Sequence, residues 1–289
     1  MKNSIQNIVL GVSIFFTLTN LQAMPKFDDS NTTKRDPINY TLILDLSDRV
    51  LNSNQLSYDI EQIKTMFGKF KQKAKQNLII TSKDRFIVKI IPQKNSPLDV
   101  NYYENALQLR LDQISIKDKN NKLNHLEDQL PVILKKLEKE AKYGKNDYDY
   151  AGVDMWLFLK ENQDNLAFSA YKNTIVIMTD GYLDFESNVQ VMQKENRFTS
   201  TRFISRLNSD TWKKDANDKD YGILPISIKN NATWIITGLK SKKPNDLMQL
   251  SKLKYFWTQW INESAKTNPF FINYSTRSQI VSELSSIIN

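Results

Sequence analysis

The chain of 289 residues contains no cysteine and a single histidine, His125. Without cysteine it can form no disulfide, thiolate nucleophile, cysteine-bound zinc site or lipid-modified cysteine anchor. A single histidine also excludes histidine-rich zinc sites and the HExxH metalloproteases. A bound metal would have to be held mainly by oxygen ligands, which suits Mg²⁺, Ca²⁺ or Mn²⁺. His125 falls in an expected helix, and we interpret it as a surface or packing residue.

An excess of acidic charge is also missing. The formal net charge is +8, from 40 Lys and Arg residues against 32 Asp and Glu residues. Most of these bases are lysines, and the chain is rich in asparagine, a combination typical of AT-rich genomes. We therefore interpret the positive charge as a solvated surface rather than a binding patch, and we expect no nucleic-acid partner.

Apolar runs long enough to span a membrane are absent as well. The run at 8–18 (IVLGVSIFFTL) follows a basic start and falls short of the ~20 apolar residues that a spanning helix needs. Residues 21–23 then end in Ala23, as a signal-peptidase site requires. We predict a signal peptide over 1–23, a flexible leader over 24–38 and one domain over 39–289. An uncleaved N-terminal anchor is the alternative.

This N-terminal pattern predicts an exported, bacterial protein that is periplasmic or secreted. After cleavage its charge would be +7, because Lys2 is the one charged residue of the first 23. We expect no membrane span in the mature chain. Lacking disulfides, it must be held together by its core, which is feasible at this length.

Strands and helices are expected to alternate along the rest of the chain. Continuous apolar runs typical of strands buried on both faces occur at 40–46, 85–91, 173–178 and 232–237, with an edge strand at 107–116 and a last strand at 270–274. Helical spacing occurs at 56–75, 123–143, 154–160, 246–262 and 278–288, and a polar excursion at 188–219 has a helical part near 198–207. This order predicts an α/β fold with a doubly wound, mostly parallel central sheet and helices on both faces.

Two carboxylates fall at the carboxyl ends of predicted central strands. Asp45 ends the first strand, and Asp180 follows the strand at 173–178. In open α/β sheets ligands bind beyond the carboxyl ends of the strands, at a point where the strand order reverses. We therefore expect Asp45 and Asp180 to share one site. The alternative is that Asp45 caps the next element and Asp180 starts a turn, without function.

The two loops read Asp45-Leu-Ser47-Asp-Arg49 and Thr179-Asp180-Gly-Tyr. Together they resemble the von Willebrand factor type A (vWA) domain, whose first strand ends in a DxSxS motif and whose third site loop often reads TDG. The resemblance covers about 38–289. It implies a metal-ion-dependent adhesion site that holds Mg²⁺ or Mn²⁺, while a ligand carboxylate completes the coordination.

The sequence departs from that family at two positions. Arg49 stands where the family has its second serine, and Val153 stands near the expected middle threonine, with Asp154 beside it. Two alternatives follow. A metal site would use Asp45, Ser47, Asp154 and Asp180, with Asp48 as a further candidate. In a metal-free site the Arg49 guanidinium would take the place of the cation and pair with Asp45 and Asp180.

The sequence contains other polar and aromatic groups besides these two loops. Tyr182 and Asp184 follow TDG closely and are expected, with Arg49, to contact a ligand at the rim. The acidic run at 215–220 lacks the glycine that an EF-hand loop needs, so we interpret it as a solvated loop. The aromatic residues at 255–257 and Trp260 share a helical face, which favours a core role over a ligand platform.

The function that these features favour is an exported vWA-like binding module, not an enzyme. It would engage a protein or another macromolecule through the loops at the carboxyl ends of the strands, with or without Mg²⁺ or Mn²⁺. One alternative is a structural component of an envelope assembly with a vestigial site. Another is a metal-dependent hydrolase in which Asp45 and Asp180 hold an ion that activates water.

Overall fold

The computed structural model describes residues 35–51, 54–76, 78–93, 96–142, 152–184, 193–243 and 246–288. The predicted signal peptide and nearly all of the predicted leader lie outside these residues. The residues from Asp36 onward form one compact unit. None of the described helices is long and apolar enough to cross a membrane.

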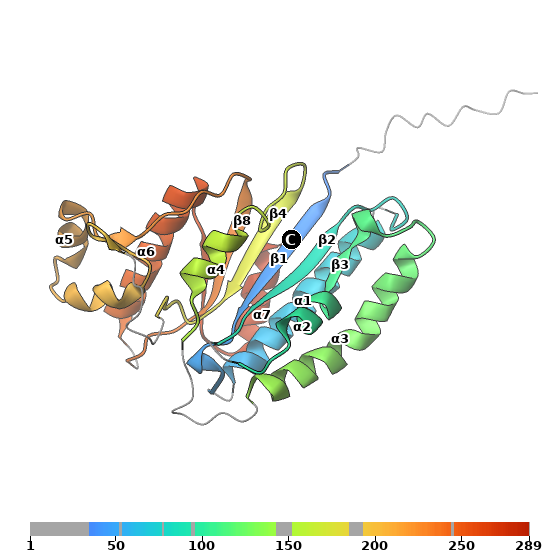
Figure 1. Ribbon diagram of the computed structural model, residues 1–289, viewed down its shortest axis with the longest axis horizontal. Coiled ribbons are helices and arrows are strands. Elements are labelled where there is room, and N and C mark those ends of the chain that lie inside the picture. Colours follow the sequence, from blue (N-terminus) through green and yellow to red (C-terminus); the bar gives the residue numbers. More distant parts are fainter. Residues whose placement is uncertain are drawn as a thin grey trace, which may run out of the picture. The chain divides into compact units, whose positions relative to one another are not determined.

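A six-stranded sheet forms the centre of this unit (Figure 1). Its strands, in spatial order, are β3 (Gln108–Arg110), β2 (Arg85–Ile91), β1 (Ile38–Asp45), β4 (Lys172–Met178), β8 (Ala232–Leu239) and β9 (Phe270–Asn273). The β2–β3 pair is antiparallel and every other pair is parallel. Because the chain leaves β1 toward β2 and later returns to β4 on the other side of β1, the strand order reverses between β1 and β4.

Helices cover both faces of the sheet, so the predicted fold class is confirmed. On β1, Leu42 and Leu44 pack into one apolar cluster and Ile43 into the other, as alternating side chains of a buried strand must. The first cluster includes residues of α1, α3 and α7, and the second includes residues of α4 and α6. Their bounds are α1 (Gln55–Gln76), α3 (Lys119–Ala141), α7 (Arg277–Ile287), α4 (Met155–Asn162) and α6 (Leu247–Ala265).

The sequence did not predict several smaller elements. The helix α2 (Val100–Ala106) is fixed by Asp99, whose carboxylate accepts from the backbone NH of Tyr102 at 2.9 Å. The expected edge strand at 107–116 is mostly wrong, because β3 gives way at once to the 3₁₀ helix η3 (Leu111–Gln113). Likewise, the helical part expected near 198–207 is the 3₁₀ helix η4 (Thr201–Arg206).

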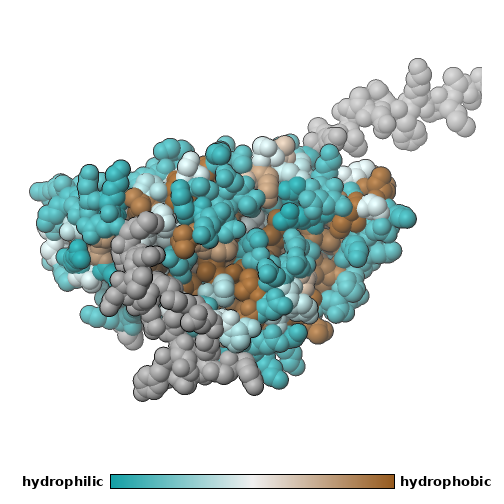
Figure 2. All heavy atoms as spheres, in the orientation of Figure 1, coloured by the Kyte–Doolittle hydropathy of each residue, from teal (hydrophilic) through white to brown (hydrophobic). Residues whose placement is uncertain are grey.

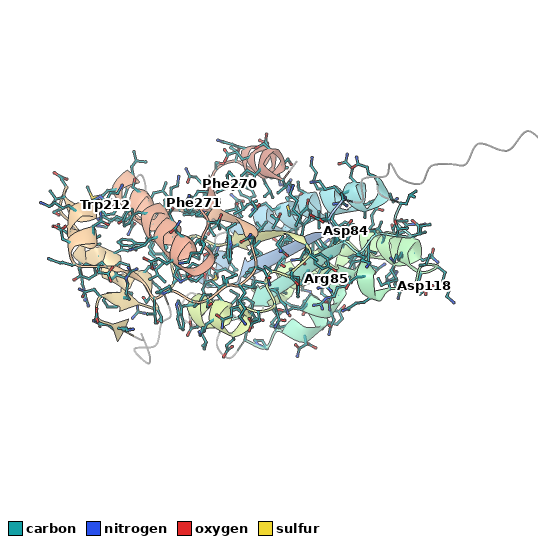
Figure 3. The ribbon with its side chains drawn as sticks, turned by 90° about the horizontal axis from the view of Figure 1, so that it is seen from above. Asp84, Arg85, Asp118, Trp212, Phe270 and Phe271 are labelled. Carbon is teal, nitrogen blue, oxygen red and sulfur yellow. The ribbon has the colours of Figure 1, made fainter. Side chains whose placement is uncertain are left out.

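The polar excursion also contains a second sheet, made of β5 (Gln193–Lys194), β6 (Arg197–Phe198) and β7 (Gly222–Ile223). Strands of two residues carry no periodic pattern, which explains why the sequence did not reveal them. The acidic run at 215–220 falls on α5 (Trp212–Asp218) and the turn after it. Figure 3 shows Trp212 at one end of the unit and Asp118, just before α3, at the other.

The aromatic stripe of α6 belongs largely to the core. Phe256, Trp257 and Trp260 have no exposed surface, which confirms the interpretation from the sequence. The face seen in Figure 2 is mostly hydrophilic, with apolar residues near its centre and in smaller patches toward its right edge. These three aromatic side chains of α6 are therefore core residues, and the surface in this view is mostly polar.

Candidate functional site

The loop after β1 is built around the buried carboxylate of Asp45. One carboxylate oxygen accepts from the backbone NH of Ser47 at 2.8 Å, and the other accepts from the hydroxyl of Thr179 at 2.7 Å. Asp45 has no exposed surface. Since Thr179 directly follows β4, this one side chain ties together the carboxyl ends of β1 and β4. A carboxylate offers about four acceptor positions, so two remain on Asp45 after these bonds.

The loop after β4 places Asp180 next to Asp45. Gly181 adopts a φ of +99°, a conformation that suits glycine, and Asp180 accepts from the backbone NH of Tyr182 at 3.1 Å. The indole NH of buried Trp257 donates to the Gly181 carbonyl at 2.8 Å and holds this loop against α6. Burial, together with the negative charge of Asp45, raises the pKa of Asp180 to about 7.

Arg49 points inward and pairs with a residue that the sequence did not single out, Asp59 of α1. A guanidinium nitrogen lies 2.8 Å from the Asp59 carboxylate, and both side chains are 2% exposed. The same group donates to the backbone carbonyls of Asp45 at 3.1 Å and Met178 at 2.9 Å. Arg49 therefore fastens α1 to the ends of β1 and β4.

The surroundings of this ion pair keep both groups in place. Asp59 accepts from the amide of Gln62 at 3.5 Å, and the Gln62 oxygen accepts from the hydroxyl of Thr237 at 2.8 Å. Burial raises the pKa of Asp59 to about 6, although the charge of Arg49 opposes this shift. The pKa of Arg49 is raised by the surrounding carboxylates despite its burial, so the guanidinium stays charged. A β-carbon on Gly238 would lie 3.3 Å from this guanidinium.

This arrangement differs from the metal-free alternative drawn from the sequence. In the part of the chain that the structure describes, no hydrogen bond or ion pair joins Arg49 to the side-chain carboxylate of Asp45 or Asp180. Arg49 is also absent from the residues that line the crevice above the two strands. The guanidinium lies beneath the site rather than in it.

That crevice has a volume of about 210 Å³ and lies at the reversal of strand order between β1 and β4. It is bounded by both site loops, by the segment before α4 and by side chains of the rim. The lining residues are Ser47, Asp48, Gly152, Val153, Asp180, Tyr182, Asp184, Arg202 and Lys242. Five of the predicted or considered positions, Ser47, Asp48, Asp180, Tyr182 and Asp184, therefore come together in one place.

A small polar network shapes the rim. Lys242 lies 3.0 Å from the Asp184 carboxylate, and its ammonium group lies 4.3 Å from the centre of the Tyr182 ring. Asp184 also accepts from the hydroxyls of Ser200 and Thr201, at 3.2 and 2.8 Å. Tyr182 and Asp184 are thus held by contacts within the protein. The sequence did not point to Lys242, because an isolated lysine in a loop carries no motif.

Asp154 has a different role from the one proposed for it. Its side chain accepts from the backbone NH of Leu157 at 2.9 Å and caps the N-terminus of α4. It is not among the residues that line the crevice, whereas its neighbours Gly152 and Val153 are. The structure thus brings Asp45, Ser47 and Asp180 together and gives Asp154 a capping role.

The donors at the crevice can be compared with what a divalent ion needs. Among the described residues no group of three or more acidic, histidine or cysteine side chains converges. Ser47 and Asp180 line the crevice with one hydroxyl and one carboxylate, and the buried Asp45 carboxylate lies behind them. Mg²⁺ is commonly held by one or two carboxylates together with waters. Burial is the main cause of the raised pKa of Asp180, and the negative charge of Asp45 adds to it. Ser47 and Asp180, with Asp45 behind them, are the residues that would hold a Mg²⁺ or Mn²⁺ at this place, with waters completing its coordination.

Comparison with known proteins finds only distant structural similarity. No family model and no curated protein matches the sequence. A solved structure of the pilus adhesin SpaC from Lactobacillus rhamnosus GG is 11% identical, with a TM-score of 0.44 over 89% of this chain. A second structure of SpaC, in an open conformation, is 10% identical, with a TM-score of 0.42 over 88% of this chain. The match covers 30% of SpaC in each case, and at this similarity neither structure bears on what this chain binds.

Proposed function

We propose that this chain is an exported, vWA-like binding module that engages a protein or another macromolecule through the crevice at the ends of β1 and β4. The observation that carries the proposal is the separation of two layers of charge. Arg49 is neutralised by Asp59 below the strands, while Asp180 and Ser47 face the crevice with Asp45 behind them. Three carboxylates and two bases line the crevice, which lies where α/β sheets bind ligands.

In its fuller form the proposal includes Mg²⁺ or Mn²⁺. Asp45, Ser47 and Asp180 would hold the ion, and the ion would offer a free coordination position to a carboxylate of the ligand. Asp184 and Lys242 pair with each other at 3.0 Å, so Lys242 does not neutralise the inner carboxylates through an ion pair. Tyr182 would contact the bound ligand from the rim.

Titration calorimetry with MgCl₂ and MnCl₂ tests the metal part directly. The wild-type chain should bind one ion with a dissociation constant in the micromolar to millimolar range, and Asp180→Asn should weaken it at least about tenfold. Asp184→Asn is the matched control, because it also removes one carboxylate from the crevice. The Asp184 carboxylate is already bonded to Lys242, Ser200 and Thr201, so its loss should not weaken ion binding. Equal heats for all three proteins, or none for any, would contradict the metal part.

The binding part is tested by an array of peptides with and without Asp and Glu, probed in Mg²⁺ and again in EDTA. We expect capture of acidic peptides in Mg²⁺ that disappears in EDTA and in Asp180→Asn. Capture that is indifferent to EDTA yet lost in Asp180→Asn would support a metal-free crevice. Capture indifferent to both would show that the crevice is not the binding site.

One observation favours the second candidate, a structural assembly component with a vestigial site. Both oxygens of Asp45 already accept hydrogen bonds from the protein, and Arg49 already supplies a buried cation to the ends of β1 and β4. A site that serves only to hold these strands together would bind no ion and capture no peptide. It would still lose stability on substitution of Asp45. The metal-dependent hydrolase stays a prediction from the sequence alone.

A further inference from the structure

A second, larger cavity lies at the edge of the sheet formed by β3, between β3, α2 and α3. Its volume is about 760 Å³, and it is lined by residues of these elements and of η3. None of the lining residues is acidic, and three carry basic groups: Arg110, Lys122 and His125. A cavity of this size suits a ligand of a few rings, and its basic lining favours a negative charge on that ligand.

The acidic residues next to this lining are already engaged elsewhere. Asp112 accepts from Arg85 at 3.0 and 2.5 Å, although it stands two residues from Arg110. Glu104 pairs with Lys89 at 2.6 Å, and Glu127 pairs with Lys71. Asp128 is exposed and does not line the cavity. Within the described residues, no ion pair neutralises Arg110, Lys122 or His125.

Among the three bases, Arg110 has the most unusual surroundings. It stands opposite Arg85 in the antiparallel pairing of β2 and β3, so two like charges face each other across the ladder. Arg85 takes the carboxylate of Asp112 and lies 4.5 Å from the ring centre of Phe168, as well as against Tyr171. Arg110 is left with a buried Nε that has no hydrogen-bond partner. The Arg110 side chain also lines the cavity, so an anion bound there can pair with its guanidinium.

The rest of the lining indicates the kind of anion. Four carboxamides line the cavity, from Asn105, Gln108, Gln113 and Gln129. Gln108 donates to Asn105 at 3.0 Å, and the remaining donors and acceptors of the four can bond hydroxyl groups. Tyr102 adds an aromatic ring and is 44% exposed. Amides beside an aromatic ring suit sugars. By contrast, β3 has three residues, so an added peptide strand would find few backbone partners there.

We propose that this cavity binds an anionic saccharide, a short chain of sugars bearing carboxylate or sulfate groups, with Arg110 and Lys122 facing the charge and the carboxamides facing the hydroxyls. The site is separate from the crevice at β1 and β4 and needs no divalent ion. A chain with both sites would hold an acidic polysaccharide at one edge of its sheet and its macromolecular partner at the carboxyl ends of the strands.

Titration calorimetry in EDTA with trigalacturonic acid tests this proposal, with its methyl ester as the neutral probe and hexaglutamate as the acidic peptide. We expect the free acid to bind at least about tenfold more tightly than the ester or the peptide. Arg110→Gln and Lys122→Gln should each weaken it about tenfold or more. Lys135→Gln, an exposed lysine of α3 outside the cavity, should stay within about twofold of wild type.

Thermal melts serve as the control that each variant is folded. Lys122 is exposed, so its substitution should not disturb the core. The proposal is overturned if hexaglutamate binds as well as trigalacturonic acid, which would make this an acidic-peptide site. It is also overturned if Arg110→Gln and Lys122→Gln bind like wild type, or if sulfated and carboxylated trisaccharides all fail to bind at ~10 mM. Binding that is lost in Asp180→Asn would place the saccharide at the crevice and would contradict it too.

Discussion

The crevice at β1 and β4 and the cavity at β3 differ in how the protein bonds their charged side chains. In the crevice, acidic groups are fixed by the protein itself: Asp45 by Ser47 and Thr179, and Asp180 by the Tyr182 backbone. In the cavity, no acidic residue is among the lining, and within the described residues Arg110 forms no ion pair, although the charge of Asp112 acts on it. The first site is part of what holds the strands together, whereas the second adds little to the fold. Changes at the crevice should therefore alter stability, and changes at the cavity should alter only binding.

The largest expected effect is at Arg49. Arg49→Met would leave Asp59 as a buried, unpaired carboxylate and remove two hydrogen bonds to backbone carbonyls. We expect the free energy of unfolding to fall by about 3–5 kcal/mol, measured by urea denaturation. Arg110→Gln is the matched change at the cavity and should cost less than about 1 kcal/mol.

A double variant separates lost pairing from lost packing. Arg49→Met combined with Asp59→Leu removes both charges, and it should recover a large part of the stability that Arg49→Met loses. Equal stability of the wild type and Arg49→Met would show that this ion pair does not hold the ends of the strands together.

The next effect concerns the backbone under the site. Gly238 has a φ of +89°, and a β-carbon there would lie 3.2 Å from the carbonyl oxygen of Thr179 and 3.3 Å from Arg49. We expect Gly238→Ala to destabilise the chain by about 1–3 kcal/mol. Gly68→Ala in α1 is the control of opposite sign, because a β-carbon there meets nothing within 4 Å. It should stabilise by about 0.5–1 kcal/mol, since alanine favours a helix. Similar shifts for both variants would contradict this account.

A pH dependence follows from Asp180. Its pKa is raised from 3.8 to about 7, so the folded chain binds a proton more tightly than the unfolded chain does. The stability from that proton is fully present below pH 3.8 and is lost as the pH rises through about 7. In EDTA, the free energy of unfolding of Asp180→Asn should therefore rise relative to that of the wild type across this pH range, by on the order of 1–2 kcal/mol. The difference between the two melting curves isolates Asp180 from Asp59, and a difference that stays constant with pH would contradict the assignment.

The smallest effect separates two roles of Asp154. Asp154→Ala should cost about 1 kcal/mol of stability, because the cap of α4 is lost. The same variant should bind Mg²⁺ and Mn²⁺ like the wild type, measured by calorimetry, since the carboxylate does not line the crevice. Loss of ion binding would restore the role that the sequence suggested for this residue.

The sequence located the crevice because strand ends are visible in apolar runs. Asp45 and Asp180 each follow such a run, and parallel pairing of β1 and β4 brings them together. Ser47 and Tyr182 followed from their positions in the same two loops. The alternation of strands and helices was also predictable, since apolar runs and apolar stripes of helical spacing mark these elements, and it implied a mostly parallel sheet with helices on both faces. The spatial order of the strands and the face that each helix covers came only from the structure.

The contacts that these residues make could not be predicted from the sequence. Asp59 occupies a polar position on a predicted helix, and nothing in the sequence shows that Arg49 turns inward to meet it rather than upward to Asp180. Asp154 stands before a helix, where capping and metal binding call for the same carboxylate. The cavity at β3 depends on α2 and η3, two short elements that carry weak periodic signals. Tertiary contacts, not local pattern, decide these cases.

The central claim is that the crevice of Asp45, Ser47 and Asp180 holds a divalent ion above a neutral Arg49–Asp59 pair. Anomalous diffraction from crystals soaked in MnCl₂ at a pH above 7 tests it most directly. The account predicts one strong peak about 2.1 Å from oxygens of Asp180 and Ser47, with Arg49 still paired to Asp59. A crevice without a peak, or a guanidinium that has moved up between Asp45 and Asp180, would contradict it.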